Sequence, residues 1–250
     1  YVPQDDRPVS LQYTVDTAKA AGMTVLTPPQ NLISGKTYKG QADQIWNWVE
    51  QNAGRADVMV LSTDTLIYGG LVDSRKHNLP LSTLENRLKR IEALKANHKN
   101  IRIYGFGTVM RSPRASGGGT EPSYYADYGP TIFQIAALQD KLDAGTLTQA
   151  ETQKLMSLQA SVPVEYLQDW FSRRQKNMQV NKDLIDEARN GVFAYFALGH
   201  DDTSQLSQSA LEGRYLNQYS KGIPRTQYGS FPGADQLGLL LMARSRTDES

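Results

Sequence analysis

The 250-residue sequence contains no cysteine and only three histidines. The absence of cysteine excludes disulfide bonds, thiolate catalysis and cysteine-ligated metals in this chain. The histidines do not show the spacing of a zinc cluster. No apolar run reaches the roughly 18 residues that a membrane helix requires, so we expect no membrane insertion.

An excess of charge of one sign is also lacking, because the formal net charge is +1. Balanced and interspersed charges provide no electrostatic basis for binding nucleic acid, so we expect no nucleic-acid partner. The chain starts at Tyr1 rather than Met, which indicates a removed signal peptide or an expression boundary. Many Gln, Asn, Ser and Tyr residues without cysteine favour a bacterial periplasmic or secreted protein.

Three well-known catalytic or nucleotide-binding motifs are missing. Residues 34–37 resemble the end of a phosphate loop, but the first glycine of that motif would fall at Gln30. Gly105 and Gly107 lie inside an apolar run and are not followed by a glycine-rich helix start, which argues against nicotinamide binding. The Gly-x-Ser-x-Gly motif of serine hydrolases does not occur.

The sequence does contain short apolar runs separated by helical patterns. Residues 58–61, 101–109 and 192–198 are typical of buried strands, while residue 2 and residues 23–26 indicate two shorter ones. This pattern predicts an α/β fold with a mostly parallel sheet of about five strands. A partial or complete TIM-like barrel is the alternative, because part of a barrel would show the same units.

Residues 130–190 have a helical pattern throughout, which is longer than the usual connection between parallel strands. We therefore expect a single α/β domain over residues 1–250, with a helical insertion at about 122–190 that covers the strand ends. Three tyrosines open this region, and they either stack on a sugar ring or pack in a core. They are Tyr124, Tyr125 and Tyr128.

Polar residues follow four of the predicted strands. They are Asp5, Asp6 and Arg7 after the first, Asp64 after 58–61, Arg111 after 101–109, and Asp201 and Asp202 after 192–198. Adjacent carboxylates are costly to bury unless they face a cleft, a cation or a substrate. Because ligands bind at the carboxyl ends of the strands in open α/β sheets and barrels, we expect one site at these ends.

The acidic residues favour a glycoside hydrolase as the leading hypothesis. Such an enzyme needs one protonated carboxyl group and one ionised carboxylate, and neighbouring acids push their pKa values apart. We assign the catalytic roles to Asp64, Asp201 and Asp202. Adjacent residues of an extended strand point in opposite directions, so if only one of the acid pair enters the site, Asp64 becomes its partner.

The remaining site residues are predicted to bind the substrate, an anionic or polyol glycan. They are Asp5, Asp6, Arg7, Tyr68, Arg75, Arg111, Asn177, Asn181 and Asp235. The arginines either bind a substrate carboxylate or phosphate, or neutralise the aspartates in a buried network. Asn177 and Asn181 share one helix face with Arg174. This face either reaches into the site or forms a solvated stripe.

Two glycine-rich segments are predicted to contact the ligand. Residues 65–75 are expected to form a loop that wraps the ligand, because Gly69-Gly70 permits close approach of the backbone. Residues 115–120 contain three consecutive glycines and are expected to form a flexible loop that acts as a lid.

Two other functions remain open at this point. Asp5, Asp64, Asp201, Asp202 and His200 offer ligands for Mg²⁺, Mn²⁺ or Ca²⁺, so a divalent metal cofactor and metal-dependent hydrolysis form one alternative. His77 and His98 are expected in surface stretches, which weakens the metal-dependent alternative. The leading hypothesis requires no cofactor. The other alternative is a non-catalytic glycan-binding or peptidoglycan-binding domain with the tyrosines as its platform.

Several motifs occur in a fixed order along the chain. They are Asp5-Asp6-Arg7-Pro8, Ser62-x-Asp64-x-Leu66-x-Tyr68-Gly69-Gly70-Leu71-x-x-Ser74-Arg75, Met110-Arg111, Arg173-Arg174-x-x-Asn177-x-x-x-Asn181, Asp201-Asp202 and Pro232-Gly233-Ala234-Asp235. This set resembles the bacterial domain of unknown function 4127 (DUF4127) family. Members of that family are longer, so the chain resembles their N-terminal half, and they often carry proline and glutamine where this chain has Gly199-His200. The resemblance implies no particular activity.

Overall fold

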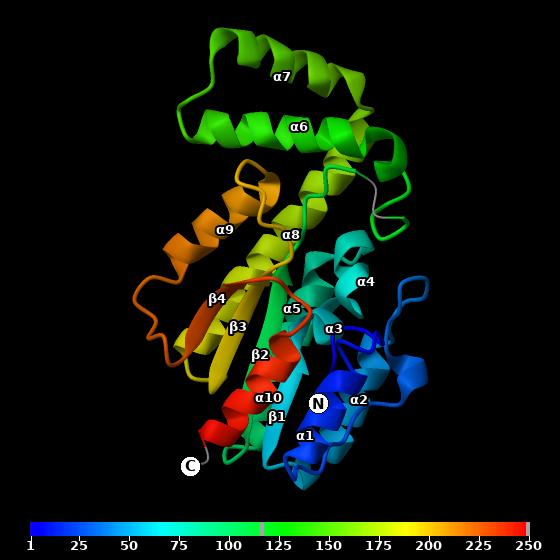
Figure 1. Ribbon diagram of the computed structural model, residues 1–250, viewed down its shortest axis with the longest axis vertical. Coiled ribbons are helices and arrows are strands. Elements are labelled where there is room, and N and C mark those ends of the chain that lie inside the picture. Colours follow the sequence, from blue (N-terminus) through cyan, green and yellow to red (C-terminus); the bar gives the residue numbers. More distant parts are fainter. Residues whose placement is uncertain (116–117, 249–250) are drawn as a thin grey trace.

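A computed structural model describes residues 1–115 and 118–248. Its centre is a parallel sheet of four strands that lie side by side in chain order, as Figure 1 shows. They are β1 (Val58–Ser62), β2 (Arg102–Val109), β3 (Tyr195–His200) and β4 (Tyr228–Pro232). The protein therefore has the predicted α/β fold. In the described residues β1 and β4 form two separate edges, so the sheet is open and the barrel alternative is wrong.

Two details of the sheet differ from the prediction. Residues 23–26 belong to no strand, and Val2 forms only a single parallel bridge with Leu61. Strand β4 was not predicted, because its sequence Tyr-Gly-Ser-Phe-Pro has the glycine, serine and proline of a turn. It forms a strand because β3 supplies backbone partners, with Phe196 opposite Tyr228.

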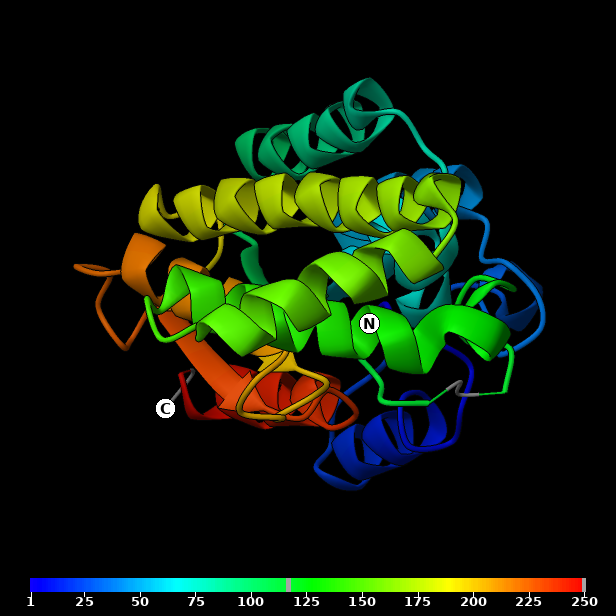
Figure 2. The same ribbon diagram turned by 90° about the horizontal axis from the view of Figure 1, so that it is seen from above.

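Helices cover both faces of the sheet because strand side chains alternate between the faces. Ile103 and Leu61 point to the face covered by α2, α3, α5 and α8, whereas Val60 and Tyr104 point to the face covered by α1 and α10. Figure 2 shows α5 and α8 on one side and α1 and α10 on the other. The sheet is thus the middle layer of three.

The helix boundaries complete this arrangement. The α-helices are α1 (Gln12–Ala20), α2 (Ala42–Asn52), α3 (Thr63–Tyr68), α4 (Leu71–Lys76), α5 (Leu81–Asn97), α6 (Tyr125–Asp143), α7 (Gln149–Ser161), α8 (Val164–Arg189), α9 (Gln208–Tyr219) and α10 (Leu237–Thr247). Short 3₁₀ helices span Gln30–Leu32 and Ala53–Arg55. None of the helices in the described ranges is long and apolar enough to cross a membrane.

Helices α6, α7 and the start of α8 lie beyond the carboxyl ends of the strands, between β2 and β3 in the chain (Figure 1). They have a hydrophobic cluster of their own. The three tyrosines belong to it: Tyr124 stacks on Tyr166 with ring centroids 4.6 Å apart, and Tyr125 is fully buried against Trp170. The packing interpretation of these tyrosines holds, and a sugar-binding platform built on Tyr125 is wrong.

Candidate functional site

Several of the predicted site residues, together with Glu121, gather in two neighbouring clusters at the carboxyl ends of the strands. One, the Asp64 cluster, consists of Asp64, Arg75, Arg111, Glu121 and Asp201. The other, the Asp5 cluster, consists of Asp5, Arg7 and Asp235. The two are joined through the backbone, because the amide of Leu71 in α4 donates to the carbonyl of Gln4 over 3.0 Å.

Asp64 lies in the first turn of α3, directly after β1. The turn forms there because Ser62 caps the helix and accepts a hydrogen bond from the amide of Thr65. The side chain is buried, and its Oδ2 accepts a hydrogen bond of 2.6 Å from the hydroxyl of Thr108 on β2. Burial raises the pKa of Asp64 to about 7, while the bonds from Thr108 and the charge of Arg75 oppose the rise. This carboxyl group can therefore exchange a proton near neutral pH.

A glycine in β2 makes room for this arrangement. A Cβ atom on Gly107 would lie 2.4 Å from Oγ1 of Thr63 and 3.7 Å from Oδ1 of Asp64. Thr63 is itself fixed, since its hydroxyl donates to the carbonyl of Phe106 over 3.0 Å. The glycine interrupts the apolar pattern of the strand so that the start of α3 can approach the sheet.

We expect Gly107→Ala to lower the free energy of unfolding by about 1–3 kcal/mol, because Thr63 and Asp64 cannot withdraw without moving α3. Urea denaturation would measure the change. Gly54→Ala is the matched control, because a Cβ atom there meets nothing within 4 Å, and it should change stability by less than about 0.5 kcal/mol. Equal effects of the two substitutions would contradict the close approach.

The guanidinium groups of the Asp64 cluster are paired with carboxylates. Arg75 in α4 is buried and donates to Oδ2 of Asp201, which follows β3. Arg111, after β2, donates from Nε to Oε1 of Glu121 over 2.6 Å. Oε1 of Glu121 also lies 3.9 Å from the NH1 nitrogen of Arg75, so the Glu121 carboxylate lies between the two arginines. This pairing matches the neutralising network predicted as the alternative role of the arginines.

The two members of the acid pair, which follow β3, point in different directions. Asp201 turns toward Arg75. Asp202 accepts hydrogen bonds from two backbone amides instead, those of Ser204 over 2.9 Å and Ser112 over 3.3 Å. Asp201 thus lies with Asp64, whereas Asp202 fixes the loops after β2 and β3.

Tyr68 lies at the end of α3, buried beside the Asp64 cluster. Its ring stacks on His77 with the centroids 4.9 Å apart. In the part of the chain that the structure describes, its hydroxyl group forms no hydrogen bond, and burial followed by the charge of Asp64 raises its pKa well above the usual value. The hydroxyl therefore remains protonated and able to donate to a ligand.

His77 was expected at the surface, and this is wrong. The residue is buried, and its Nε2 lies 2.7 Å from Oδ1 of Asn177 on α8. Burial lowers its pKa to about 4, although the bond to Asn177 opposes the change. His77 is therefore neutral at physiological pH and supports the ring of Tyr68.

The polar face of α8 holds the strand-end segments in place. Arg174 donates to Glu212 and to the carbonyls of Met110 and Arg111 over 2.6–2.8 Å. Asn177 and Asn181 donate to the backbone carbonyls of Ser74 and Thr108, respectively. All three side chains of this face are buried, so the solvated-stripe interpretation is wrong. Their donors contact protein atoms at the site.

The Asp5 cluster is more exposed. Arg7 donates from Nε to Oδ2 of Asp5 over 2.8 Å, and its NH2 nitrogen lies 2.6 Å from Oδ1 of Asp235, which follows β4. About half of the side chains of Arg7 and Asp235 is accessible. Asp6 contacts the hydroxyl of Tyr38. This cluster ties the loop after Val2 to the end of β4.

Comparison with known proteins gives one match. The family model described as "Protein of unknown function (DUF4127)" matches residues 1–250. The chain belongs to the DUF4127 family. No curated protein and no solved structure matches it.

Three side chains that contact the candidate site of this DUF4127 protein were not predicted. Thr108 binds Asp64, Glu121 joins Arg75 to Arg111, and Glu212 neutralises Arg174. Thr108 is the second-last residue of the predicted strand 101–109, so its position could have indicated a polar side chain at the site. Glu121 and Glu212 approach from a loop and from α9, and nothing in their local sequence marks them.

One of the two glycine-rich segments differs from the prediction, and the other lies partly outside the described residues. Residues 65–75 were expected to form a ligand-wrapping loop, but they form most of helices α3 and α4. Gly70 approaches residue 34 of the protein itself, since a Cβ atom on it would lie 1.8 Å from Oγ of Ser34. The predicted lid at 115–120 includes residues 116–117, which lie outside the described residues.

The metal-binding alternative in this DUF4127 protein was based on four aspartates and His200. Asp5 lies in a cluster apart from Asp64, and His200 Nε2 lies 2.7 Å from Oγ of Ser230. Within residues 1–115 and 118–248, no group of three or more acidic or histidine side chains is arranged to hold a metal ion.

Proposed function

We propose that this protein is a glycoside hydrolase in which Asp64 is the general acid and Asp201 the ionised carboxylate. The observation that carries the proposal is the buried Asp64, with a pKa raised to about 7, near the Arg75–Asp201 ion pair. Glycoside hydrolysis needs one carboxyl group that stays protonated and one that stays ionised. Burial without a direct cation supports the first role for Asp64, and the guanidinium of Arg75 supports the second for Asp201.

The charges in the Asp64 cluster favour an uncharged polyol over an anionic glycan. Without counting Asp64, the cluster holds two guanidinium groups and two carboxylates. Those of Glu121 and Asp201 balance the charges of Arg75 and Arg111. A substrate carboxylate would have to displace one of these carboxylates. Sugar hydroxyl groups would instead accept from the Tyr68 hydroxyl and donate to the acidic oxygens. A periplasmic or secreted location would give such an enzyme access to glycans.

A screen of the wild-type protein tests this proposal. The panel would contain neutral and uronic-acid aryl glycosides, each assayed with and without EDTA. We expect hydrolysis of a neutral glycoside that EDTA leaves unchanged. Loss of hydrolysis in EDTA would support the metal-dependent alternative, and specific glycan binding without any hydrolysis would support a binding domain; either outcome overturns the proposal.

A further inference from the structure

The ring of Tyr68 rests on the imidazole of His77. The ring centroids are 4.9 Å apart and the ring planes meet at 26°. In the part of the chain that the structure describes, no hydrogen bond fixes the Tyr68 hydroxyl. Packing alone therefore sets the direction of this hydroxyl, and the stacked imidazole is part of that packing. What holds the imidazole thus also affects where the hydroxyl points.

The imidazole of His77 has a hydrogen-bond partner at each nitrogen atom. Nδ1 accepts from the amide of Leu79 over 3.2 Å, so this nitrogen carries no proton. Nε2 lies 2.7 Å from Oδ1 of Asn177. Nδ2 of Asn177 donates to the carbonyl of Ser74 over 2.8 Å, which leaves Oδ1, an acceptor, toward His77. Nε2 must therefore carry the proton, and the two neighbours select the same neutral tautomer.

Three cationic side chains near His77 disfavour a second proton on its ring. They are Arg173, Lys176 and Arg87. Burial lowers the pKa of His77 to about 4, and these charges add to the effect, while the hydrogen bond to Asn177 opposes it. Arg173 also fixes the backbone, because its Nε donates to the carbonyl of His77 over 2.7 Å. His77 therefore keeps one protonation state and one position at physiological pH.

We propose that Asn177 and His77 are positioning residues that direct the Tyr68 hydroxyl toward a hydroxyl group of the substrate. This role rests on the proposed function, in which Tyr68 donates to a sugar hydroxyl. Asn177 was predicted to bind the substrate itself, but both polar atoms of its side chain are engaged by Ser74 and His77. The hydroxyl is the atom of Tyr68 farthest from the backbone, so a small rotation of the ring displaces this donor most.

A double-mutant cycle tests whether Asn177 acts through Tyr68. Leucine has nearly the shape of asparagine but makes neither hydrogen bond. We expect Asn177→Leu and Tyr68→Phe each to raise KM for the neutral glycoside about three- to tenfold, the usual contribution of one uncharged hydrogen bond, with little change in kcat. The double variant should raise KM no further than Tyr68→Phe alone. Multiplication of the two effects in the double variant would overturn the proposal.

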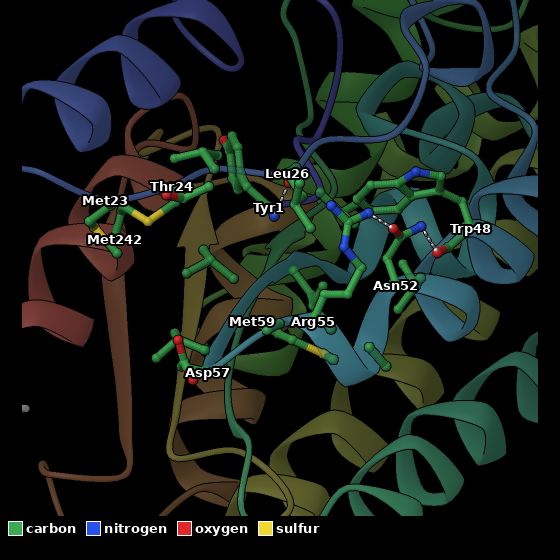
Figure 3. Close-up of a pocket in the computed structure, with 18 of the residues that line it drawn as sticks. Tyr1, Met23, Thr24, Leu26, Trp48, Asn52, Arg55, Asp57, Met59 and Met242 are labelled. Carbon is green, nitrogen blue, oxygen red and sulfur yellow. Dashed lines mark hydrogen bonds between the residues drawn. The ribbon is translucent and has the colours of Figure 1, made fainter.

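Asn52 provides the matched control. It is the last residue of α2, which leads into the amino end of β1, whereas Asp64 follows the carboxyl end. In the cavity of Figure 3 its Nδ2 donates to the carbonyl of Trp48 over 2.8 Å, and its Oδ1 accepts from Arg55 over 2.9 Å. Asn52→Leu removes the same two kinds of bond, and KM should stay unchanged. A rise in KM equal to that of Asn177→Leu would contradict the positioning role.

NMR of the ring nitrogen atoms tests the role of His77 without a substrate, and so separates it from glycoside hydrolysis. At pH 7 we expect a neutral ring with its proton on Nε2 in the wild type. Asn177→Leu should mix the two tautomers and shift the ring resonances of Tyr68, whereas Asn52→Leu should change neither. A wild-type ring protonated at Nδ1, or unchanged resonances in Asn177→Leu, would overturn the positioning role even if the glycoside is hydrolysed. The screen alone decides the glycosidase activity.

Discussion

The Asp64→Asn variant is expected to hydrolyse its glycoside about 10²- to 10⁴-fold more slowly than the wild type, the usual contribution of a general acid. Asparagine keeps the shape of the side chain and still accepts the hydrogen bond from Thr108, but it has no proton of suitable acidity to give. Steady-state kinetics on the substrate found in the screen would measure the loss. Wild-type activity should also fall as the pH rises through about 7, where Asp64 loses its proton.

The pH dependence of the free energy of unfolding tests the burial of Asp64 without the need for a substrate. Its pKa is raised from about 3.9 in the unfolded chain to about 7 in the folded protein. The protonated group therefore favours folding fully below pH about 4, and this contribution is lost as the pH rises through about 7. The difference corresponds to about 4 kcal/mol.

Asparagine cannot ionise, so Asp64→Asn should become more stable than the wild type as the pH rises from 4 to 8. Urea unfolding at several pH values would measure this. Two companion variants separate the acid pair: Asp201→Asn should reduce activity strongly, whereas Asp202→Asn should mainly loosen the loops bound to Ser112 and Ser204. Full activity in Asp64→Asn, or identical stability curves for variant and wild type, would contradict the role of Asp64.

Arg174→Met is expected to lower the free energy of unfolding by about 3–5 kcal/mol, because it leaves a buried carboxylate without its cation. Arg174 is 1% exposed and binds both oxygens of Glu212 at 2.8 Å. It also bonds the carbonyls of Met110 and Arg111, which follow β2. Its loss should therefore also disturb the segment that carries Arg111 to the Asp64 cluster. Chemical denaturation would measure the change.

An exposed ion pair provides the control. Arg189 and Asp186 pair on the same helix with side chains 39% and 38% exposed, so Arg189→Met should cost at most about 1 kcal/mol. The double variant Arg174→Met, Glu212→Leu should recover part of the loss, since no unpaired charge remains. A loss for Arg174→Met no larger than for Arg189→Met would contradict the structural role of the buried pair.

Local sequence determined much of this fold. The apolar runs that become β1, β2 and β3 predict strands because both faces of a parallel sheet are covered by helices. The placement of Asp64 and Asp201 directly after two of these strands predicts their meeting, because the ends of parallel strands lie at one edge of a sheet. The long helical pattern before β3 likewise becomes α6, α7 and α8.

Only the tertiary structure decided how those parts are used. Strand β4 exists because β3 supplies its hydrogen-bond partners, whereas residues 23–26 belong to no strand of the described chain despite their apolar pattern. Glu121 and Glu212 come from distant segments to pair with Arg75, Arg111 and Arg174. The pKa of Asp64 depends on burial, which no local pattern encodes. Strand propensity and charge are properties of a residue and its neighbours in the chain, but strand pairing and desolvation depend on contacts that only the folded chain creates.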